Sequence, residues 1–320
     1  MKLCADVGGS FVDMGIVDGN GDVHFRTRTP TPLHDWAEFV DLFRRKLAEH
    51  ADILSDDSPL CLAVAGLADP DTGALTSANI PSLHGRAIVA DLTAALRRPI
   101  SVINDADAFA LAEATLGVGR GYRRVFGMIL GTGVGGGLVE DGEVLVGAHG
   151  IGGEWGHGAV LVASPLAPGA VPVFACGCGR TGCLDTIGGA RGLERLHGFL
   201  HPGAVATSSA ITGGWLAGDV ACSATIDYYV ALLAGPIAMV MNSFPAEVVP
   251  VGGGLSNCRE LIARLDESVR AGMLEPTDQP VLVPTVLRDR AGLLGAALGA
   301  ERPHALRPVP HVSMPRAIGA

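Results

Sequence analysis

A strand that runs into a glycine turn and returns as a second strand occurs twice in this chain. The first unit covers residues 3–18, with Gly8-Gly9-Ser10 between its two strands. The second begins with Arg124–Leu130, turns through Gly131–Gly137 and continues into Leu138-Val139. Strand patterns separated by glycine turns are typical of β-hairpins. The repetition predicts a fold of two similar halves, each of which could grip part of one phosphate chain.

The rest of the chain alternates short apolar strands with helical patterns, which indicates an α/β fold. Helices are expected over Asp35–Leu54, Ala221–Ser243 and Arg259–Ala271. A length of 320 residues is sufficient for two domains with a cleft between them. We expect residues 1–117 to form the first domain and residues 118–289 the second. A last helix, at about 290–301, is expected to pack back on the first domain. The run 302–320 lacks periodicity and is expected to be a mobile tail.

Charge and hydropathy narrow the range of partners. The formal net charge of -10 disfavours nonspecific binding to nucleic acid or to an anionic membrane, because both are negatively charged. The longest apolar stretch, Tyr228–Phe244, is short for a membrane span and contains Pro236 and Asn242, so we expect a buried helix. Asp6 interrupts the apolar run that a secretory signal would need. We therefore expect a cytoplasmic protein with reduced cysteines, without a nucleic-acid or membrane partner.

The first glycine turn has the chemistry of a phosphate site. Its glycines let backbone amides approach an oxyanion closely, the hydroxyl of Ser10 adds a donor, and the carboxylate of Asp6 can hold hydrated Mg²⁺. The alternative is an ordinary hairpin turn that binds nothing.

The second glycine turn formally contains the G-x-G-x-x-G pattern of dinucleotide-binding proteins, over residues 131–136. Such a loop must open a helix, whereas Leu138–Gly142 has a strand-and-turn pattern. A phosphate-gripping hairpin fits this context better. A third glycine run follows an apolar strand at Val248–Val251, and its open backbone could admit a flat adenine. The residues predicted to hold the nucleotide are Asp6, Gly8, Gly9, Ser10, Gly131, Thr132, Gly133, Gly253 and Gly254.

Asn104-Asp105 stands where the strand Ile100–Ile103 gives way to an alanine-rich helix. This position exposes side chains at the mouth of an α/β sheet. Asp is also a preferred N-cap residue, so Asp105 could simply satisfy the first helical amides. Beside a phosphate site, however, its carboxylate could take the proton of an acceptor hydroxyl that attacks a γ-phosphoryl group.

One histidine and three cysteines form a potential metal site. His157 is followed by a glycine-rich segment that contains Cys176, Cys178 and Cys183. One imidazole and three thiolates make a closed tetrahedral Zn²⁺ set of the structural kind. The alternative is a loop of reduced cysteines, but this segment has few apolar residues with which to order itself. Glu154 and Asp185 flank the loop, so fixing the loop would also fix two carboxylates.

Taken together, these residues resemble the ROK family of repressors, open reading frames and sugar kinases, from Asp6 to about Gly299. The resemblance implies an actin-like ATPase (ribonuclease H-like) fold with a ligand cleft between two domains. It implies that Asp105 is the catalytic base, that ATP and Mg²⁺ are bound by the glycine hairpins, and that His157 and the three clustered cysteines hold structural Zn²⁺. The sugar-binding positions that it implies are Gly66, Asn79, Asn104, Asp105, Glu154, His157 and Asp185.

Within the family, Ala78-Asn79-Ile80-Pro81 and the run 252–257 look most like bacterial N-acetylglucosamine kinases. This likeness implies phosphorylation of N-acetylglucosamine at its 6-hydroxyl, with glucokinase or N-acetylmannosamine kinase activity as alternatives. Two residues depart from the family pattern: Asp107 replaces the usual Asn, and Asp185 replaces the usual Glu. A sugar-sensing protein without catalysis is a further alternative, although family repressors carry a helix-turn-helix segment for which we expect no room before Asp6. A homodimer is compatible with the sequence.

Overall fold

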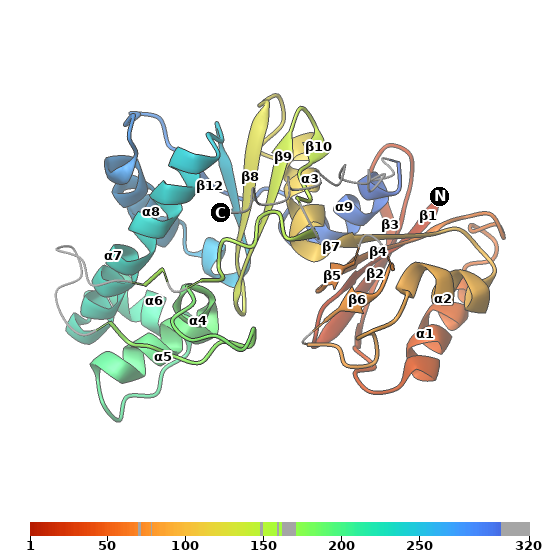
Figure 1. Ribbon diagram of the computed structural model, residues 1–320, viewed down its shortest axis with the longest axis horizontal. Helices are drawn as coiled ribbons and strands as arrows, with labels where there is room; N and C mark the ends of the chain where they lie inside the picture. The colour runs from red at the N-terminus through yellow and green to blue at the C-terminus, as the bar shows by residue number, and fades with distance from the viewer. Residues whose placement is uncertain (70–71, 78, 148–149, 159, 162–170, 302–320) are drawn as a thin grey trace, which may run out of the picture.

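The computed structural model has two lobes, each built around one five-stranded sheet (Figure 1). It describes residues 1–69, 72–77, 79–147, 150–158, 160–161 and 171–301. The tail expected over 302–320 lies outside the described residues. A separate two-stranded sheet consists of β5 (Leu67–Ala68) and β6 (Leu75–Thr76). The predicted α/β class is confirmed.

The first sheet has the strand order β3-β2-β1-β4-β7. The strands β1 to β3 form an antiparallel meander, and β4 and β7 continue the sheet parallel to β1. All residues of β4 are buried, as expected of a central strand that is covered on both faces. Helices α1 and α2 cover one face and α9 covers the other. These elements are β1 (Lys2–Val7), β2 (Phe11–Val17), β3 (Val23–Pro30), β4 (Leu60–Val64), β7 (Ile100–Asn104), α1 (Trp36–Glu49), α2 (Ile88–Leu96) and α9 (Ala291–Gly299).

The second sheet repeats this arrangement with the order β10-β9-β8-β11-β12. Again the first three strands in the chain form an antiparallel meander, and the last two run parallel to the first of them. These strands are β8 (Arg124–Leu130), β9 (Val134–Glu140), β10 (Glu143–Val144), β11 (Val249–Gly252) and β12 (Leu282–Pro284). The internal repetition that the glycine turns predict is therefore present in the topology of both sheets.

Five helices complete the second lobe: α4 (Asp185–Gly188), α5 (Ala190–Leu200), α6 (Ser208–Leu216), α7 (Val220–Ser243) and α8 (Arg259–Gly272). Of the helices described, α7 is long and apolar enough to cross a membrane by length and composition, but 56% of its most apolar window is buried against the rest of the chain. Tyr229 of α7 is fully buried, and its hydroxyl donates to the carbonyl of Gly188 at 2.6 Å. The stretch expected to be a buried helix thus forms the core of this lobe.

Helices α3 (Asp105–Leu116) and α9 lie between the two sheets and pack against each other (Figure 1). α3 also packs on β8 and β9, and this approach requires small residues. A Cβ added at Gly127 of β8 would lie 2.6 Å from the Cβ of Ala110. Because α9 packs on the first sheet, its position supports the domain division expected above, which we propose as the organisation of the chain.

Several element boundaries differ from the sequence-based expectations. The first helix was expected over Asp35–Leu54 but ends at Glu49, because the chain turns back there and the Leu54 amide donates to the carbonyl of His50 at 2.8 Å. The second glycine turn is limited to residues 131–133, since Val134–Glu140 is a strand. That strand confirms that the G-x-G-x-x-G pattern does not open a dinucleotide-binding helix. Helices α2, α4, α5 and α6, strands β5 and β6, and the short 3₁₀ helices η2 (Gly254–Asn257) and η3 (Arg288–Arg290) were not expected.

Candidate active site

The carboxyl ends of β1, β4 and β7 meet at one edge of the first sheet. Val7, Val64 and Asn104 are aligned across these parallel strands, so the residues that follow each strand lie close together. The side-chain amide of Asn104 donates to the carbonyl of Gly66 at 3.0 Å. Asn79 lies against the first glycine turn, where a Cβ added at Gly9 would be 3.0 Å from its Cβ. This edge therefore brings together four of the predicted sugar and phosphate positions.

Asp105 occupies the first position of α3 but is not its N-cap. The side chain of Asn104 caps the helix and accepts from the amides of Ala106 at 2.9 Å and Asp107 at 3.1 Å. Asp105 Oδ1 also accepts from the Ala106 amide, at 3.0 Å. Burial raises the pKa of Asp105, while the backbone amides of Ala106 and of Asp105 itself and the Asn104 side chain lower it. The capping role that competed with catalysis in the sequence belongs to Asn104.

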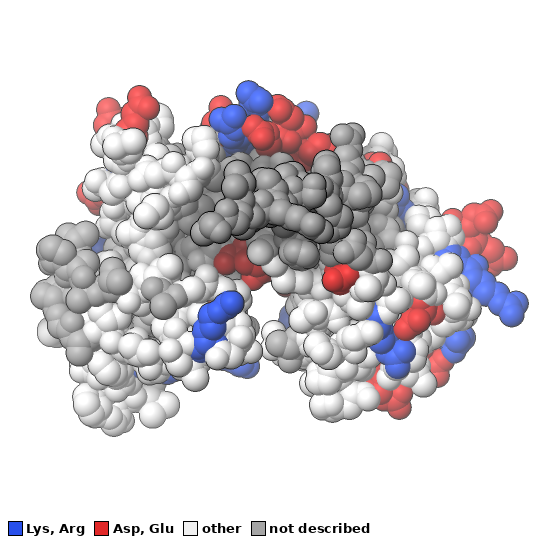
Figure 2. Space-filling model, viewed as in Figure 1, with Lys and Arg blue, Asp and Glu red and all other residues white. Residues whose placement is uncertain are grey.

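A group of carboxylates surrounds Asp105. The pKa of Asp6 is raised to about 7, mainly by burial and then by the charges of Asp105 and Asp13, against the opposing effect of arginines in β3. Burial raises the pKa of Asp107 to about 8, with Asp105 and Glu154 adding to the effect. Asp107 is 4% exposed, and its Oδ1 has no hydrogen-bond partner among the described residues. Figure 2 shows a hollow between the lobes, with acidic side chains where the lobes meet.

Both glycine turns lie near this group. Asp6 lies just before the first turn, and it interacts electrostatically with Asp105. On the other side, a Cβ added at Gly135, just beyond the second turn, would lie 3.4 Å from the Cβ of Ala106. Asp105 therefore interacts with the acid beside the first hairpin, and the first turn of its helix lies close to the second.

His157, Cys176, Cys178 and Cys183 come together in the second lobe. Their ligand atoms all lie within 4.8 Å of one another. Cys176 Sγ is 3.7 Å from His157 Nδ1, and the Sγ atoms of Cys178 and Cys183 are also 3.7 Å apart. A tetrahedron with Zn–S bonds of about 2.3 Å separates its sulfurs by about 3.8 Å, so the spacing and the donor types fit Zn²⁺.

The thiols of this cluster differ in their acidity. The backbone amide of Arg180 is the main cause that lowers the pKa of Cys178 to about 7, which favours the thiolate that a metal requires. Burial raises the pKa of Cys176 to about 12. By contrast, Cys4 and Cys61 are neighbours on β1 and β4 in the buried core of the first lobe.

His157 connects the metal-ligand cluster to the acidic group. Its Nδ1 faces Cys176, and its Nε2 lies 3.4 Å from Glu154 Oε2. A histidine held in this way has a fixed ring orientation. Burial raises the pKa of Glu154, His157 lowers it, and Asp105 and Asp185 raise it. Glu154 is thus positioned by the cluster and lies within electrostatic reach of the proposed base.

Asp185 begins α4, and its carboxylate is directed at the second glycine turn. Its Oδ1 accepts from the Val134 amide at 2.8 Å. Its Oδ2 lies 3.6 Å from Cys176 Sγ. The sequence associated Asp185 with the sugar, and it gave no indication of this backbone contact.

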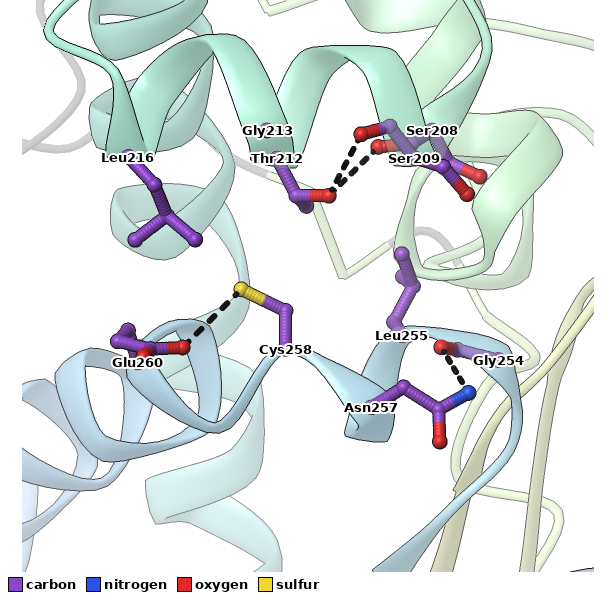
Figure 3. A pocket seen from close by; sticks show the side chains of 10 residues that line it. All are labelled: Ser208, Ser209, Thr212, Gly213, Leu216, Gly254, Leu255, Asn257, Cys258 and Glu260. Carbon is purple, nitrogen blue, oxygen red and sulfur yellow. Dashed lines mark hydrogen bonds between the residues drawn. The ribbon is translucent and has the colours of Figure 1, made fainter.

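A cavity of about 310 Å³ lies between α6 and the start of α8 (Figure 3). Its lining combines hydroxyls and amides with the apolar side chains of Leu216 and Leu255. Gly254 lines it, and the neighbouring Gly253, with a φ of 83°, packs against the backbone of Leu130 and Gly131. The third glycine run therefore connects the cavity to the second hairpin. The lining residues are Ser208, Ser209, Thr212, Gly213, Leu216, Gly254, Leu255, Asn257, Cys258 and Glu260.

Only Gly254 in this lining was expected from the sequence. The residues from α6 were missed because a short helix with Gly213-Gly214 in its interior gives no clear helical pattern. Gly292 of α9 was also missed; its backbone lies directly against the carboxylate of Asp6. A glycine in the first turn of this apolar helix was the sequence signal for the close approach.

Two repeated α/β lobes, a carboxylate between two glycine hairpins and an adjoining cavity define the protein as an ATP-dependent sugar kinase with the actin-like ATPase fold. The chain belongs to the ROK family, whose sequence profile matches residues 2–302.

Individual relatives agree with this assignment. The chain is 33% identical over 297 residues to the N-acetylgalactosamine kinase AgaK of Shewanella sp. (strain ANA-3), covering 92% of this chain and 94% of that protein. It is 32% identical over 294 residues to an N-acetyl-D-glucosamine kinase of Yersinia pseudotuberculosis, covering 91% and 96% of the two proteins. The crystal structure of the ROK hexokinase from Thermus thermophilus superposes with a TM-score of 0.77 at 29% identity, covering 94% and 97% of the two chains.

Proposed function

We propose that this sugar kinase phosphorylates an N-acetylhexosamine at its 6-hydroxyl, and that N-acetylglucosamine is its substrate. The observation that carries the phosphoryl-transfer chemistry is the place of Asp105 at the start of α3, where Asn104 makes the cap. Asp105 interacts electrostatically with Asp6 beside the first hairpin, and the next residue, Ala106, lies close to the second. The choice of sugar is supported by relatives named for N-acetylated hexosamines.

In the proposed reaction, Asp105 accepts the proton of the sugar hydroxyl as its oxygen attacks the γ-phosphorus of ATP. The new O–P bond forms, the bond from the γ-phosphorus to the bridging oxygen breaks, and ADP leaves. A raised pKa suits this task, because a more basic carboxylate takes the proton more readily. Mg²⁺, for which Asp6 is the proposed anchor, would neutralise the charge of the phosphate chain.

The remaining roles follow from position. The hairpin residues Gly8–Ser10 and Gly131–Gly133 are proposed to hold the phosphates through their backbone amides. The cavity beside Gly253 and Gly254 is proposed to hold the adenine, and its mixture of apolar and hydrogen-bonding groups is typical of small-molecule sites. The sugar is proposed to contact Gly66, Asn79, Asn104, Glu154 and His157.

His157, Cys176, Cys178 and Cys183 are proposed to hold structural Zn²⁺. A fixed loop would hold Glu154 in place for a sugar hydroxyl through the contact between Glu154 and His157. We also propose a cytoplasmic location, which suits a site that needs reduced thiols. Assembly as a homodimer stays a prediction, which light scattering on the purified protein would test.

A coupled assay that detects ADP tests the activity and the substrate together. The sugars to compare are N-acetylglucosamine, N-acetylgalactosamine, N-acetylmannosamine, glucose, fructose and allose. We expect the kcat/KM for N-acetylglucosamine to exceed that for glucose by about tenfold or more, because a site built to bind the amide leaves polar groups unpaired with glucose. Phosphorus NMR of the product should place the phosphate on the 6-hydroxyl. If none of the sugars in the panel supported ADP formation, the kinase assignment would be refuted. A preference for another hexosamine would refute only the choice of substrate.

A further inference from the structure

The segment that begins at Asp185 holds the second glycine turn at several points. Asp185 Oδ1 accepts from the Val134 amide at 2.8 Å and lies so close to Gly133 that a side chain there would collide with it. At the start of α5, the Ala190 amide donates to the carbonyl of Gly131 at 2.8 Å. A Cβ added at Gly189 would be 2.6 Å from the carbonyl oxygen of Thr132. Each residue of the turn thus touches the segment 185–190.

This segment is itself fixed from two sides. Tyr229 of the buried helix α7 donates to the carbonyl of Gly188 at 2.6 Å. The Asp185 amide donates to the carbonyl of Gly156 at 3.0 Å, and Asp185 Oδ2 lies 3.6 Å from Cys176 Sγ. One carboxylate therefore contacts both the metal-ligand cluster and the backbone of the turn.

The length of the side chain decides which of these contacts is made. Aspartate places its carboxylate one methylene closer to its own backbone than the glutamate usual in the family. In this chain the shorter side chain reaches the Val134 amide, and a hydrogen bond from a backbone amide to an ionised carboxylate is of the stronger kind. The oxygen that makes this bond is directed at the glycine turn.

We propose that Asp185 is a positioning residue for the second nucleotide-holding hairpin and links the metal-ligand loop to phosphate binding. This inference rests on the proposed function, because it assumes that the turn 131–133 holds the phosphates of ATP. It makes nucleotide affinity depend on a residue next to the cysteine cluster, more than 40 residues away in sequence from the turn that it supports.

The test is to measure binding of Mg-AMP-PNP and of N-acetylglucosamine separately, by isothermal titration calorimetry, in Asp185→Ala, Asp185→Glu and Asp185→Asn. Asp185→Ala should weaken nucleotide binding about tenfold, the equivalent of one charge-assisted hydrogen bond. Asp185→Glu should weaken nucleotide binding as well, because its carboxylate is displaced from the Val134 amide. Asp185→Asn keeps an acceptor at the same reach without the charge, so its nucleotide affinity should lie between those of the wild type and of Asp185→Ala.

Glu143→Ala is the matched control, since it removes an exposed carboxylate from the same sheet at the opposite end of β9. Zinc content, measured by mass spectrometry, shows whether a variant has lost the metal; if Asp185→Ala has, the comparison of Asp185→Glu with Asp185→Asn decides. Weaker sugar binding with unchanged nucleotide binding would overturn the inference, as would unchanged binding of both ligands. The wild type reports on the proposed function separately: a wild type that binds no nucleotide refutes that function and not merely the role of Asp185.

Discussion

Asp107 shows how one buried residue can make stability depend on pH. Its side chain is almost fully buried, Oδ1 has no partner among the described residues, and the nearby charges of Asp105 and Glu154 are of the same sign as its own. With a pKa of about 8, this carboxyl is mostly protonated at neutral pH. A protonated carboxyl group carries a donor and an acceptor, as does the asparagine usual in the family.

The sign of the pH dependence follows from this shift. Between the ordinary pKa of aspartate, about 4, and the folded value of about 8, the folded chain keeps a proton that the unfolded chain releases. Asp107 therefore contributes full stability below about pH 4, and this contribution is lost as the pH rises toward 8. Asp107→Asn should unfold at higher urea concentration than the wild type at pH 8, with the difference shrinking toward pH 5.

Urea midpoints between pH 5 and pH 9 would measure this difference. The slope with pH should be reduced and not abolished, because Asp6 has a raised pKa of the same sign and remains in the variant. Asp52→Asn, at an exposed position, serves as the control and should follow the wild type. Parallel curves for Asp107→Asn and the wild type would contradict the assignment of a protonated Asp107.

Two adjacent residues allow catalysis and capping to be tested apart. Asp105→Asn should lower kcat by about 10² to 10⁴-fold, because it removes the proposed base, while stability remains near that of the wild type. Asn104→Ala should lower the free energy of unfolding by about 1 kcal/mol or more, because it removes the cap of α3 and the bond to Gly66. Steady-state kinetics and urea unfolding of both variants provide the comparison. Full turnover in Asp105→Asn would exclude this residue as the base.

At the scale of elements, the run 176–183 of the metal-ligand loop has no apolar side chain apart from its cysteines, so it is expected to depend on its metal. Cys178 is the exposed member of the cluster, so Cys178→Ser changes a ligand without opening a hole in the core. We expect lower zinc content, a melting temperature reduced by several degrees and a higher KM for the sugar, because Glu154 is held through His157. Since Asp185 borders Cys176, nucleotide affinity should fall as well.

Cys222→Ser is the control for this experiment, because Cys222 lies outside the cluster and loses a thiol in the same way. Zinc analysis, thermal unfolding and calorimetry would be run on both variants. A Cys178→Ser protein that has lost its zinc but keeps the sugar KM and the melting temperature of the wild type would contradict the structural role of the metal.

The elements that the sequence predicted well are those with strong local signals. The strands of both meanders were found because apolar runs are bounded by glycine turns, and α7 and α8 because they are long. Helices α4 to α6 were missed because they are short, and because α6 carries two glycines in its interior. Local pattern is weak evidence where tertiary packing stabilises a short element.

The candidate site divides in the same way. Residue types and their order along the chain identified the hairpins, Asp105 and the cysteine cluster. Contacts that depend on where distant segments meet were not predictable, such as the bond from Val134 to Asp185 or the cavity between α6 and α8. The sequence also could not decide whether Asn104 or Asp105 caps α3, since both residue types are favoured caps.

For the whole molecule, the contact of α3 with the second sheet matters most, because α3 starts at the proposed base and packs between both sheets. Gly127 of β8 is the tightest described point that can be tested simply, as an added Cβ would meet the Cβ of Ala110 at 2.6 Å and its Cα at 2.7 Å. Neither atom is the end of a flexible side chain, so the helix must move away from the sheet.

Gly127→Ala should therefore lower the free energy of unfolding by about 1 to 3 kcal/mol. It should also reduce kcat, because α3 carries Asp105 and would be displaced from β8. Gly198→Ala is the matched control. Gly198 lies inside α5, where an added Cβ would make only an ordinary contact at 3.5 Å, so alanine should stabilise the helix by about 0.5 to 1 kcal/mol. Urea unfolding and steady-state kinetics of both variants would show whether any replacement of glycine by alanine is harmful, or only one that displaces α3. Unchanged stability and turnover in Gly127→Ala would mean that the packing of α3 on β8 does not set the position of the base.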